Sequence, residues 1–325
     1  MNSILVIQTA FIGDVVLATA ALEKLHQFYP TAKIDMLIRK GNEGLLENHP
    51  FINDLLIWNK KESKYKNLSA IIKQVRSSKY DAVFNLQRFA ASGLVTFLSG
   101  AKYKAGFDKN PFSFSYNHKV NHQIGNGKHE IERNQEVLEP KTTKTKALPQ
   151  LYPSASDFEK VTKYQENEYV VLAPASVWYT KQLPQNKWVE LIKTLNPKLN
   201  VYLIGGPGDI EYCKGITKDL FGNKIEILAG KLSFLESAAL MKGAKMNYVN
   251  DSAPLHIAGA VKAPVTAIFC STIPSFGFGP ILPNGKIAEI GTDLDCRPCG
   301  LHGLRECPKG HFKCATDINM KSVAV

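Results

Sequence analysis

The sequence predicts an α/β protein built from two Rossmann-like halves, each a doubly wound parallel sheet with helices between its strands. Continuous apolar runs of strand length alternate with helix-like segments through both halves, as in parallel sheets. A polar, Lys- and Thr-rich stretch bounded by prolines separates the halves at residues 140–149. A chain of 325 residues also suggests two domains of roughly 150 residues each. We therefore expect one domain over residues 1–150 and a second over residues 151–325.

The first half opens with the order strand, loop, helix and strand. Ser3–Gln8 is a continuous apolar run typical of a buried parallel strand, and Thr9–Asp14 is the loop after it. A helix is expected over Val15–Tyr29, where Pro30 ends it. The further strands expected in this half are 32–38, 54–58, 80–85 and 104–107, and the further helices are 65–77, 90–98 and 129–138.

The second half restarts the same alternation. Ser233 is a good N-cap with Glu236 three residues later, which together predict a capping box at the start of one helix. The strands expected here are 169–173, 200–205, 224–228, 245–249 and 264–270, and the helices are 184–194, 210–221 and 233–242, with another after residue 250.

The formal net charge of +11 indicates an attraction to anions, such as nucleic acid, an anionic membrane face or a phosphorylated substrate. The basic residues are denser over 60–79 and 102–146 but form no compact block of the kind found in nucleic-acid-binding tails. No apolar run reaches the roughly 18 residues that would span a bilayer. Since Met1–Ser3 lacks a basic start and no apolar signal core follows, we expect a cytosolic protein without a signal peptide.

The segment Asn250–Ala260 is the strongest candidate for an anion site. A short apolar run ends in an Asn-Asp-Ser turn, where Asp251 or Ser252 is a natural N-cap and Pro254 suits the first helical turn. The free amides and the positive dipole end of such a helix favour a phosphate. The alternative, an ordinary capped turn between strand and helix, is equally open from these residues alone.

Asp14 is the candidate general base of the first half. It follows Gly13 at the start of the first helix, just beyond the carboxyl end of the first strand, where α/β sheets place their ligands. A carboxylate there can accept a proton from a ligand. The more conservative alternative is that Asp14 only caps the helix.

Two other residues of the second half have possible ligand roles. Asp209 ends a Gly-rich turn at 205–209, where it can accept from ribose hydroxyls or act only within the turn. That turn is not the Gly-x-Gly-x-x-Gly fingerprint, which argues against an NAD-dependent dehydrogenase. Lys181 lies between a strand and a helix, where it can pair with a phosphate or remain solvated.

The C-terminal region holds four cysteines and a histidine within about twenty residues. Cys296, Cys299, Cys307 and Cys314 could close a tetrahedral zinc site with His311 nearby. The six residues between the last two cysteines are unusual for a zinc knuckle, and a cytosolic chain argues against disulfides. We favour reduced structural thiols over zinc, and zinc over disulfides.

Taken together, these motifs resemble glycosyltransferase family 9, the ADP-heptose:lipopolysaccharide heptosyltransferases. The resemblance spans nearly the whole chain and rests on the order and spacing of several segments. They are the opening strand Ile4–Ile7 with Phe11–Val15, Ala20–Leu22 and Tyr29–Pro30, Tyr80–Val83, the His-x-x-Glu-Arg segment His129–Arg133, Asn250–His256, and the Cys-rich tail.

This resemblance implies a GT-B fold, with two Rossmann-like domains and the active site between them. The first domain would bind the acceptor and the second the nucleotide sugar. The reaction implied is an inverting, metal-independent transfer of heptose from ADP-heptose to the lipopolysaccharide inner core, without a cofactor. Asp14 would be the catalytic base. The residues implied on the donor side are Gly13, Ser176, Lys181, Asp209, Leu232, Asp251, Ser252, Ala253 and His256.

The acceptor would be an anionic, lipid-linked saccharide, so basic residues of the first domain are candidates to bind it. These residues are Lys60, Lys61, Lys64, Lys66 and Arg88. The enzyme implied is a cytoplasmic monomer, peripheral to the inner membrane face, that does not bind nucleic acid.

Two departures from the family pattern put the donor in question. Ala253 stands where the phosphate-binding turn usually carries Gly, and Pro174 lacks the usual following Gly. One alternative therefore keeps the mechanism with another nucleotide sugar or acceptor, as in O-antigen or capsule assembly. An epimerase has no signature here, and a zinc-stabilised nucleic-acid-binding protein is the most distant alternative.

Overall fold

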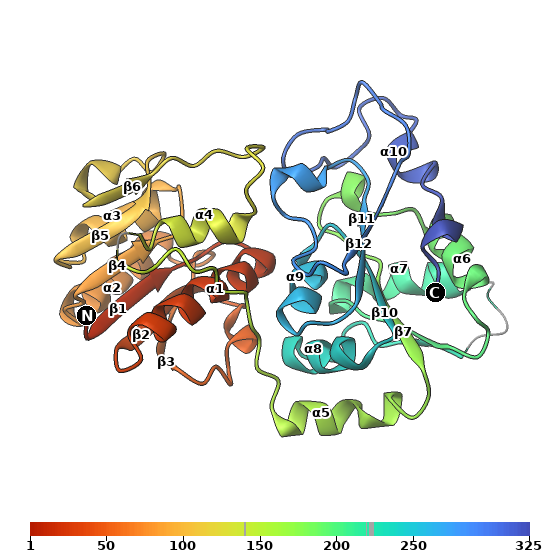
Figure 1. Cartoon of the computed structure of the whole chain (residues 1–325), viewed down its shortest axis with the longest axis horizontal. Helices are drawn as coiled ribbons and strands as arrows, with labels where there is room; N and C mark the ends of the chain where they lie inside the picture. Colours follow the sequence, from red (N-terminus) through yellow and green to blue (C-terminus); the bar gives the residue numbers. More distant parts are fainter. Residues whose placement is uncertain (140, 219, 221–223) are drawn as a thin grey trace. The chain divides into compact units, whose positions relative to one another are not determined.

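The computed structural model describes residues 1–139, 141–218, 220 and 224–325. The chain divides into two compact units, Met1–Tyr152 and Pro153–Val325, and each has its own parallel sheet (Figure 1). No helix within these described ranges is long and apolar enough to cross a membrane.

The first unit is a six-stranded sheet in the order β3-β2-β1-β4-β5-β6, with every neighbouring pair parallel. Its helix α2 packs against α3, and both contribute to a core over strands β1, β3 and β4, while α1 packs against α4. The strands are β1 (Ser3–Ile7), β2 (Lys33–Arg39), β3 (Ile52–Trp58), β4 (Ala82–Asn85), β5 (Tyr103–Phe107) and β6 (His118–Val120). The helices are α1 (Ile12–Phe28), α2 (Lys64–Ser77), α3 (Ala90–Leu98) and α4 (Glu130–Glu136), with short 3-10 turns at Glu43–Leu45 and Ser113–Ser115.

The second unit is also a six-stranded parallel sheet, in the order β12-β11-β10-β7-β8-β9. The strands are β7 (Tyr169–Ala173), β8 (Asn200–Leu203), β9 (Ile225–Ile227), β10 (Met246–Asn250), β11 (Val265–Phe269) and β12 (Lys286–Glu289). The helices are α5 (Ala155–Val161), α6 (Gln185–Thr194), α7 (Ile210–Thr217), α8 (Phe234–Gly243), α9 (Ala253–Ala260) and α10 (Lys313–Thr316). The 3-10 turns are Thr162–Tyr164, Tyr179–Lys181, Pro207–Asp209, Pro274–Phe276 and Met320–Val323.

Both sheets have the same topology when the strands are counted from the start of each unit. Counted in this way, the order is 3-2-1-4-5-6 in both units. In such a sheet the strand order reverses between strands 1 and 4, and ligands bind at the carboxyl ends of these two strands. The sites are therefore expected beyond β1 and β4 in the first unit and beyond β7 and β10 in the second.

The predicted α/β class with two Rossmann-like sheets is confirmed, while several element boundaries were wrong. Helix α1 begins at Ile12 instead of Val15, because the Asp14 side chain accepts from the Phe11 amide and closes the first turn. Four elements were missed, all short: β6, α5, β12 and α10. Residues 219 and 221 of the predicted helix 210–221 and residue 140 of the predicted linker lie outside the described residues.

Candidate active site

Asp14 lies in the first turn of α1, beyond the carboxyl end of β1. Its Oδ2 atom accepts from the backbone N–H of the N-cap residue Phe11 at 3.2 Å. The capping role that the sequence left open is therefore present. A carboxylate accepts through two oxygens, so capping and proton transfer are compatible at Asp14.

The electrostatic surroundings of Asp14 suit a base that works near neutral pH. Burial, and then the neighbouring Glu130 carboxylate, raise the pKa of Asp14 to about 6, against the opposing effects of the Phe11 amide and Arg88. At pH 7 such a group is mostly ionised, yet it binds a proton far more readily than an ordinary aspartate. Glu130 is a site residue that the sequence analysis did not single out.

Glu130 is held ionised by its own partners. Its Oε2 atom accepts from Arg133 Nε at 2.7 Å and lies 3.8 Å from His122 Nε2. Burial alone would raise the pKa of Glu130, but the contacts with His122 and Arg133 outweigh that effect and lower it. A persistent negative charge therefore lies near Asp14.

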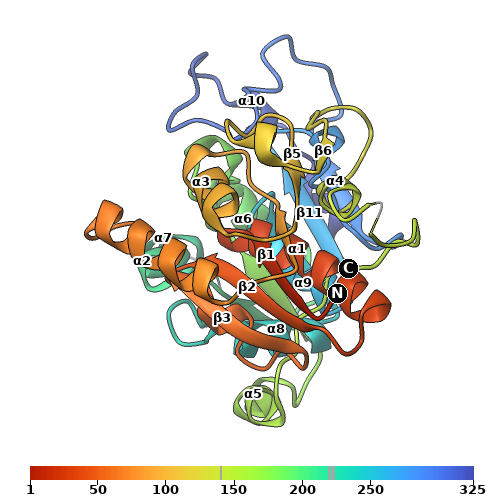
Figure 2. The ribbon, with the colours of Figure 1, turned by 90° about the vertical axis from the view of Figure 1, so that its left-hand side faces the viewer.

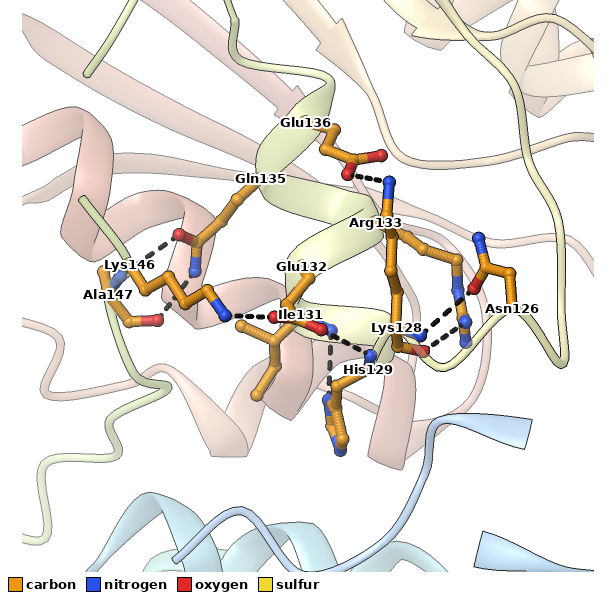
Figure 3. Close-up of polar contacts among 10 residues, drawn as sticks. All are labelled: Asn126, Lys128, His129, Ile131, Glu132, Arg133, Gln135, Glu136, Lys146 and Ala147. Atoms are coloured by element: carbon orange, nitrogen blue, oxygen red, sulfur yellow. Dashed lines mark hydrogen bonds and ion pairs between the residues drawn. The ribbon is translucent and has the colours of Figure 1, made fainter. Parts of the chain in front are cut away.

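The His-x-x-Glu-Arg segment builds the helix that carries Glu130 (Figure 3). His129 is the N-cap of α4 and accepts from the Ile131 amide at 3.2 Å, while Glu132 accepts from the His129 amide at 2.8 Å. Arg133 is buried and also donates to the Lys128 carbonyl at 2.6 Å. This motif thus has a structural basis, in a closed helix start and a buried ion pair.

The predicted acceptor residues divide into three groups. Arg88 follows β4 and acts electrostatically on Asp14, whereas Lys61, Lys64 and Lys66 are exposed at the start of α2. Lys60 points inward: it donates to the carbonyl and hydroxyl oxygens of Thr9 at 2.9 and 2.8 Å. Burial and then Arg39 lower the pKa of Lys60 to about 8. Lys60 therefore secures the loop that leads to Asp14.

In the second unit the structure brings two predicted donor residues into one ion pair. Lys181 Nζ lies 2.7 Å from Asp251 Oδ2, and the Thr272 hydroxyl donates to the same oxygen at 2.6 Å. Asp251 is buried at the carboxyl end of β10, while Lys181 is partly accessible. Through this ion pair, Asp251 holds the Lys181 ammonium in place.

Asn250 fixes the loop on which Lys181 lies. Its Oδ1 atom accepts from the Leu183 amide at 3.1 Å, and its Nδ2 atom donates to the Pro174 carbonyl at 2.7 Å. Both ends of the loop after β7 are therefore tied to the last residue of β10. In the sequence, Asn250 is recognisable only as part of the turn, and no local pattern predicts this role.

Ser252, not Asp251, is the N-cap of α9. Its hydroxyl makes no capping bond to the helix among the described residues and lies 3.4 Å from the Asn250 carbonyl. Ala253 and Pro254 form the first turn, and His256 is buried in the next turn with its ring 6.3 Å from that of Phe278. The amides at this helix end and Lys181 thus come from the carboxyl ends of the two switch-point strands, β10 and β7.

The other predicted donor residues lie on neighbouring loops. The Ser176 amide donates to Gln182 Oε1 at 3.0 Å, and Asp209 accepts from the Gly206 amide at 2.7 Å, so Asp209 does act within its turn. Leu232 is partly exposed just before the Ser233 N-cap of α8. Gly13 is the second residue of α1, in the first unit, and so does not share a unit with these residues.

The Cys-rich tail packs against the lysine loop. The Thr180 amide donates to the Leu304 carbonyl at 3.1 Å, and the Leu304 amide donates to the Thr180 hydroxyl at 2.7 Å. A Cβ atom added at Gly303 would lie 2.8 Å from Lys181 Cγ. The tail therefore helps to set the position of Lys181, a role that the sequence analysis missed.

The tail thiols are not arranged as a metal centre in the part of the chain that the structure describes, where no three His, Cys, Asp or Glu side chains are grouped to hold an ion. Cys296 Sγ lies 3.9 Å from His311 Nε2, and none of the six cysteines, all of them described, is in a disulfide. Burial and then neighbouring thiols raise the pKa of Cys314 to about 11, which keeps that thiol protonated. Reduced structural thiols stay our prediction.

Comparisons with known proteins now identify the family. The sequence profile of glycosyltransferase family 9 (heptosyltransferase) matches residues 68–303, more than half of the chain. Lipopolysaccharide heptosyltransferase 3 of Escherichia coli is 31% identical over 281 residues, which cover 81% of this chain and 82% of that protein.

Two solved structures from E. coli share the fold. ADP-heptose lps heptosyltransferase II is 21% identical and covers 92% of this chain and 96% of its own, with a TM-score of 0.79. Heptosyltransferase WaaC with ADP is 22% identical and covers 99% of this chain and 97% of its own, with a TM-score of 0.75. The two parallel sheets are thus those of a GT-B glycosyltransferase, and the chain belongs to glycosyltransferase family 9, the heptosyltransferases.

Proposed function

We propose that this glycosyltransferase transfers heptose from ADP-heptose to the lipopolysaccharide core, with inversion at the anomeric carbon and without a metal ion. The observation that carries the mechanism is the Asp14 carboxylate, at the switch point of the first sheet with a pKa near 6. The choice of substrates is supported by the relative named lipopolysaccharide heptosyltransferase 3 and by the ADP named in the WaaC structure.

In the proposed reaction an acceptor hydroxyl oxygen attacks the anomeric carbon of the heptose. The bond from that carbon to the diphosphate oxygen breaks on the opposite face, and its electron pair leaves with ADP. Asp14 takes the hydroxyl proton as the new bond forms, which is general base catalysis. The sugar configuration is thereby inverted in a single displacement.

The leaving group carries developing negative charge, which the second unit would stabilise. Lys181 supplies a cation held in place by Asp251, and the first-turn amides of α9 supply oriented donors and the positive end of a helix dipole. In the proposal, the Ser252 hydroxyl contributes a further hydrogen-bond donor, and Ser176 and His256 line the same site. Asp209 would contact the ribose, and Leu232 would contact the adenine. This set of groups can perform the charge stabilisation that other enzymes assign to a metal.

The acceptor in this proposal is an anionic saccharide on a lipid, bound by the first unit. Arg88 is the basic residue with an electrostatic link to Asp14, so it would contact the acceptor near the reacting hydroxyl. Lys61, Lys64 and Lys66 would attract the acceptor from solution, and Lys60 would support the loop from behind. We propose a monomer in the cytoplasm, peripheral to the inner membrane.

A donor screen tests the assignment. Purified protein is incubated with a lipid A–Kdo acceptor, or the same acceptor already carrying inner-core heptose, and with ADP-heptose, GDP-mannose, UDP-glucose or UDP-N-acetylglucosamine. We expect turnover with ADP-heptose and inverted product configuration by NMR. Turnover with another sugar alone would overturn the donor assignment and would favour the second candidate, in which Ala253 marks a changed donor preference.

A further inference from the structure

Helix α3 buries Val95 in the core together with Ser92 and Thr96, and it leaves Phe97 on its outer side. Ser92 and Thr96 are buried, and the Thr96 hydroxyl accepts from Asn85 Nδ2 at 3.0 Å in the interior. Phe97 on the same helix is 39% exposed, and Phe89 at its N-cap is 63% exposed. A helix that covers a sheet normally turns its apolar side inward and its hydroxyls outward. The outer face of α3 thus leaves an aromatic side chain in contact with solvent.

Phe97 gathers with two rings of the loop between β5 and β6 into one aromatic patch, defined as Phe97, Phe112 and Phe114. Phe97 lies 5.8 Å from Phe112 and 5.6 Å from Phe114 between ring centroids, and Phe114 is 68% exposed. Exposed aromatic side chains gathered in this way mark an interaction surface more often than isolated apolar residues do.

Hydrogen bonds and close packing connect the loop of the patch to the neighbouring elements. Asn110 Nδ2 donates to the carbonyls of Gln87 and Phe89 at 3.0 and 3.1 Å, which ties the β5–β6 loop to the loop after β4. A Cβ atom at Gly93 would lie only 1.9 Å from Asn110 Oδ1, so α3 packs tightly onto the same side chain. Phe89, the N-cap of α3, directly follows Arg88, so the helix that bears Phe97 begins at the loop of Arg88.

A cationic helix lies beside the patch. Helix α2 packs against α3 on one face of the first sheet, as Figure 2 shows. It exposes Lys64, Lys66, Lys73 and Arg76 and contains no acidic residue. Exposed rings beside a helix with four exposed cations match an anionic bilayer, whose interface accepts aromatic rings and whose headgroups attract Lys and Arg.

We propose that the α2–α3 face of the first unit is a docking surface for anionic lipid. The aromatic patch enters the interfacial layer of the bilayer, and the α2 cations lie against the headgroups. This arrangement holds the Arg88–Phe89 loop at the membrane surface, where a lipid-linked acceptor presents its sugars, and in that respect it rests on the proposed function. A protein partner is less well matched, since protein interfaces are depleted of lysine.

Vesicle flotation with purified full-length protein, without donor or acceptor, tests this surface separately from the transferase activity. The vesicles are phosphatidylethanolamine and phosphatidylcholine with or without phosphatidylglycerol. The wild type should bind the anionic vesicles and lose binding in high salt. The paired variant Phe97→Ser with Phe114→Ser, and the paired variant Lys73→Glu with Arg76→Glu, should each lower the partition coefficient by about tenfold or more.

Matched controls are made at residues outside helices α2 and α3. Lys193→Glu with Lys198→Glu makes the same charge change on exposed residues of the second unit, and Phe28→Ser removes an exposed ring at the end of α1. Both controls should bind like the wild type. The proposal is overturned if the wild type does not bind anionic vesicles, or if both paired variants bind them as well as the wild type does. It is also overturned if the control variants lose as much vesicle binding as the paired variants do.

Self-association is the remaining outcome to separate. If sedimentation shows a dimer that the Phe97 and Phe114 substitutions dissociate, and vesicles do not bind, the occupant is a second copy and the lipid proposal fails. Transfer to a short, soluble acceptor should stay within twofold of wild type in the ring variant. If the wild type binds anionic vesicles but transfers no heptose to any acceptor, the proposed function fails while the docking surface stands.

Discussion

At the scale of single residues, Asp14 shows how one side chain can both build a helix and serve chemistry. One oxygen accepts from the Phe11 amide, while burial and Glu130 raise the pKa to about 6. A raised carboxylate pKa means that the ionised form is less stable in the folded protein than in the unfolded chain. The folded enzyme thus holds a reactive base at a cost in stability.

Replacing Asp14 with asparagine should reduce kcat by about 10²- to 10⁴-fold, because general base catalysis contributes that much. Binding of ADP, measured by calorimetry, should remain within about twofold, since the donor site proposed here lies in the other unit. The cap should survive, because an amide oxygen can accept from Phe11 in the same way. Wild-type turnover in this variant would remove Asp14 from the mechanism.

The same variant has a defined effect on stability. With the folded pKa raised above the unfolded value, the stability contribution of Asp14 is fully present below pH 3.8 and is lost as the pH rises through about 6. Above pH 6, Asp14→Asn should therefore be more stable than wild type, on the order of 1 kcal/mol for a partly accessible group. At pH 4 most of this gain should disappear, as thermal melts at the two pH values would show.

At the scale of elements, the loop after β7 depends on contacts from three distant segments. Asn250 of β10 ties its ends, Asp251 orients Lys181, and Leu304 of the tail bonds Thr180. Each partner lies far away in the sequence, so the local pattern around Lys181 carries no sign of it. The Cys-rich tail, for which zinc binding was one alternative, contacts the loop of Lys181 and helps to position that lysine.

The variant Gly303→Ala, with Gly300→Ala as a matched control, tests whether the tail positions Lys181. The added Cβ would meet Lys181 Cγ at 2.8 Å, whereas a Cβ at Gly300 meets nothing within 4 Å, and both glycines have positive φ angles of 75° and 88°. The backbone strain of a non-Gly residue is therefore similar in the two variants. Gly303→Ala should raise the KM for the donor by about tenfold, with a smaller effect of Gly300→Ala. Equal kinetics in both variants would argue that the tail does not position Lys181.

At the scale of the whole molecule, two sheets of the same strand order each have a separate core. In the proposed function, one sheet supplies the base and the acceptor side, and the other supplies the phosphate clamp. A ligand that binds only one of them should stabilise that unit selectively, because binding to the native state alone shifts its unfolding equilibrium.

ADP should therefore raise the melting temperature of the second unit alone. The Trp58→Phe variant leaves tryptophan only in the second unit, so its fluorescence reports that transition. At an ADP concentration of about 100 times Kd, stabilisation of about 2.7 kcal/mol should raise this melting temperature by about 5–10 °C. Lys181→Met should abolish most of this rise in melting temperature. The double variant Trp178→Phe, Trp188→Phe keeps only Trp58, which reports the first unit. An equal rise in its melting temperature would contradict the placement of the ADP site in the second unit.

The sequence by itself determined the α/β class, the two Rossmann-like halves and the family, because these depend on local periodicity and on motifs that are contiguous in the chain. Apolar runs at Ser3–Ile7 and Tyr169–Ala173 mark buried strands wherever they occur. The turn at 250–252 likewise predicts a helix start, because Asn, Asp and Ser are favoured N-cap residues.

Only the tertiary structure decided which neighbours each functional side chain has. Four features join residues that are distant in sequence. They are the ion pair of Lys181 with Asp251, the inward direction of Lys60, the charge of Glu130 near Asp14, and the contacts of Phe97 with Phe112 and Phe114. Distances, burial and electrostatic shifts arise from packing between elements, and no local pattern specifies them.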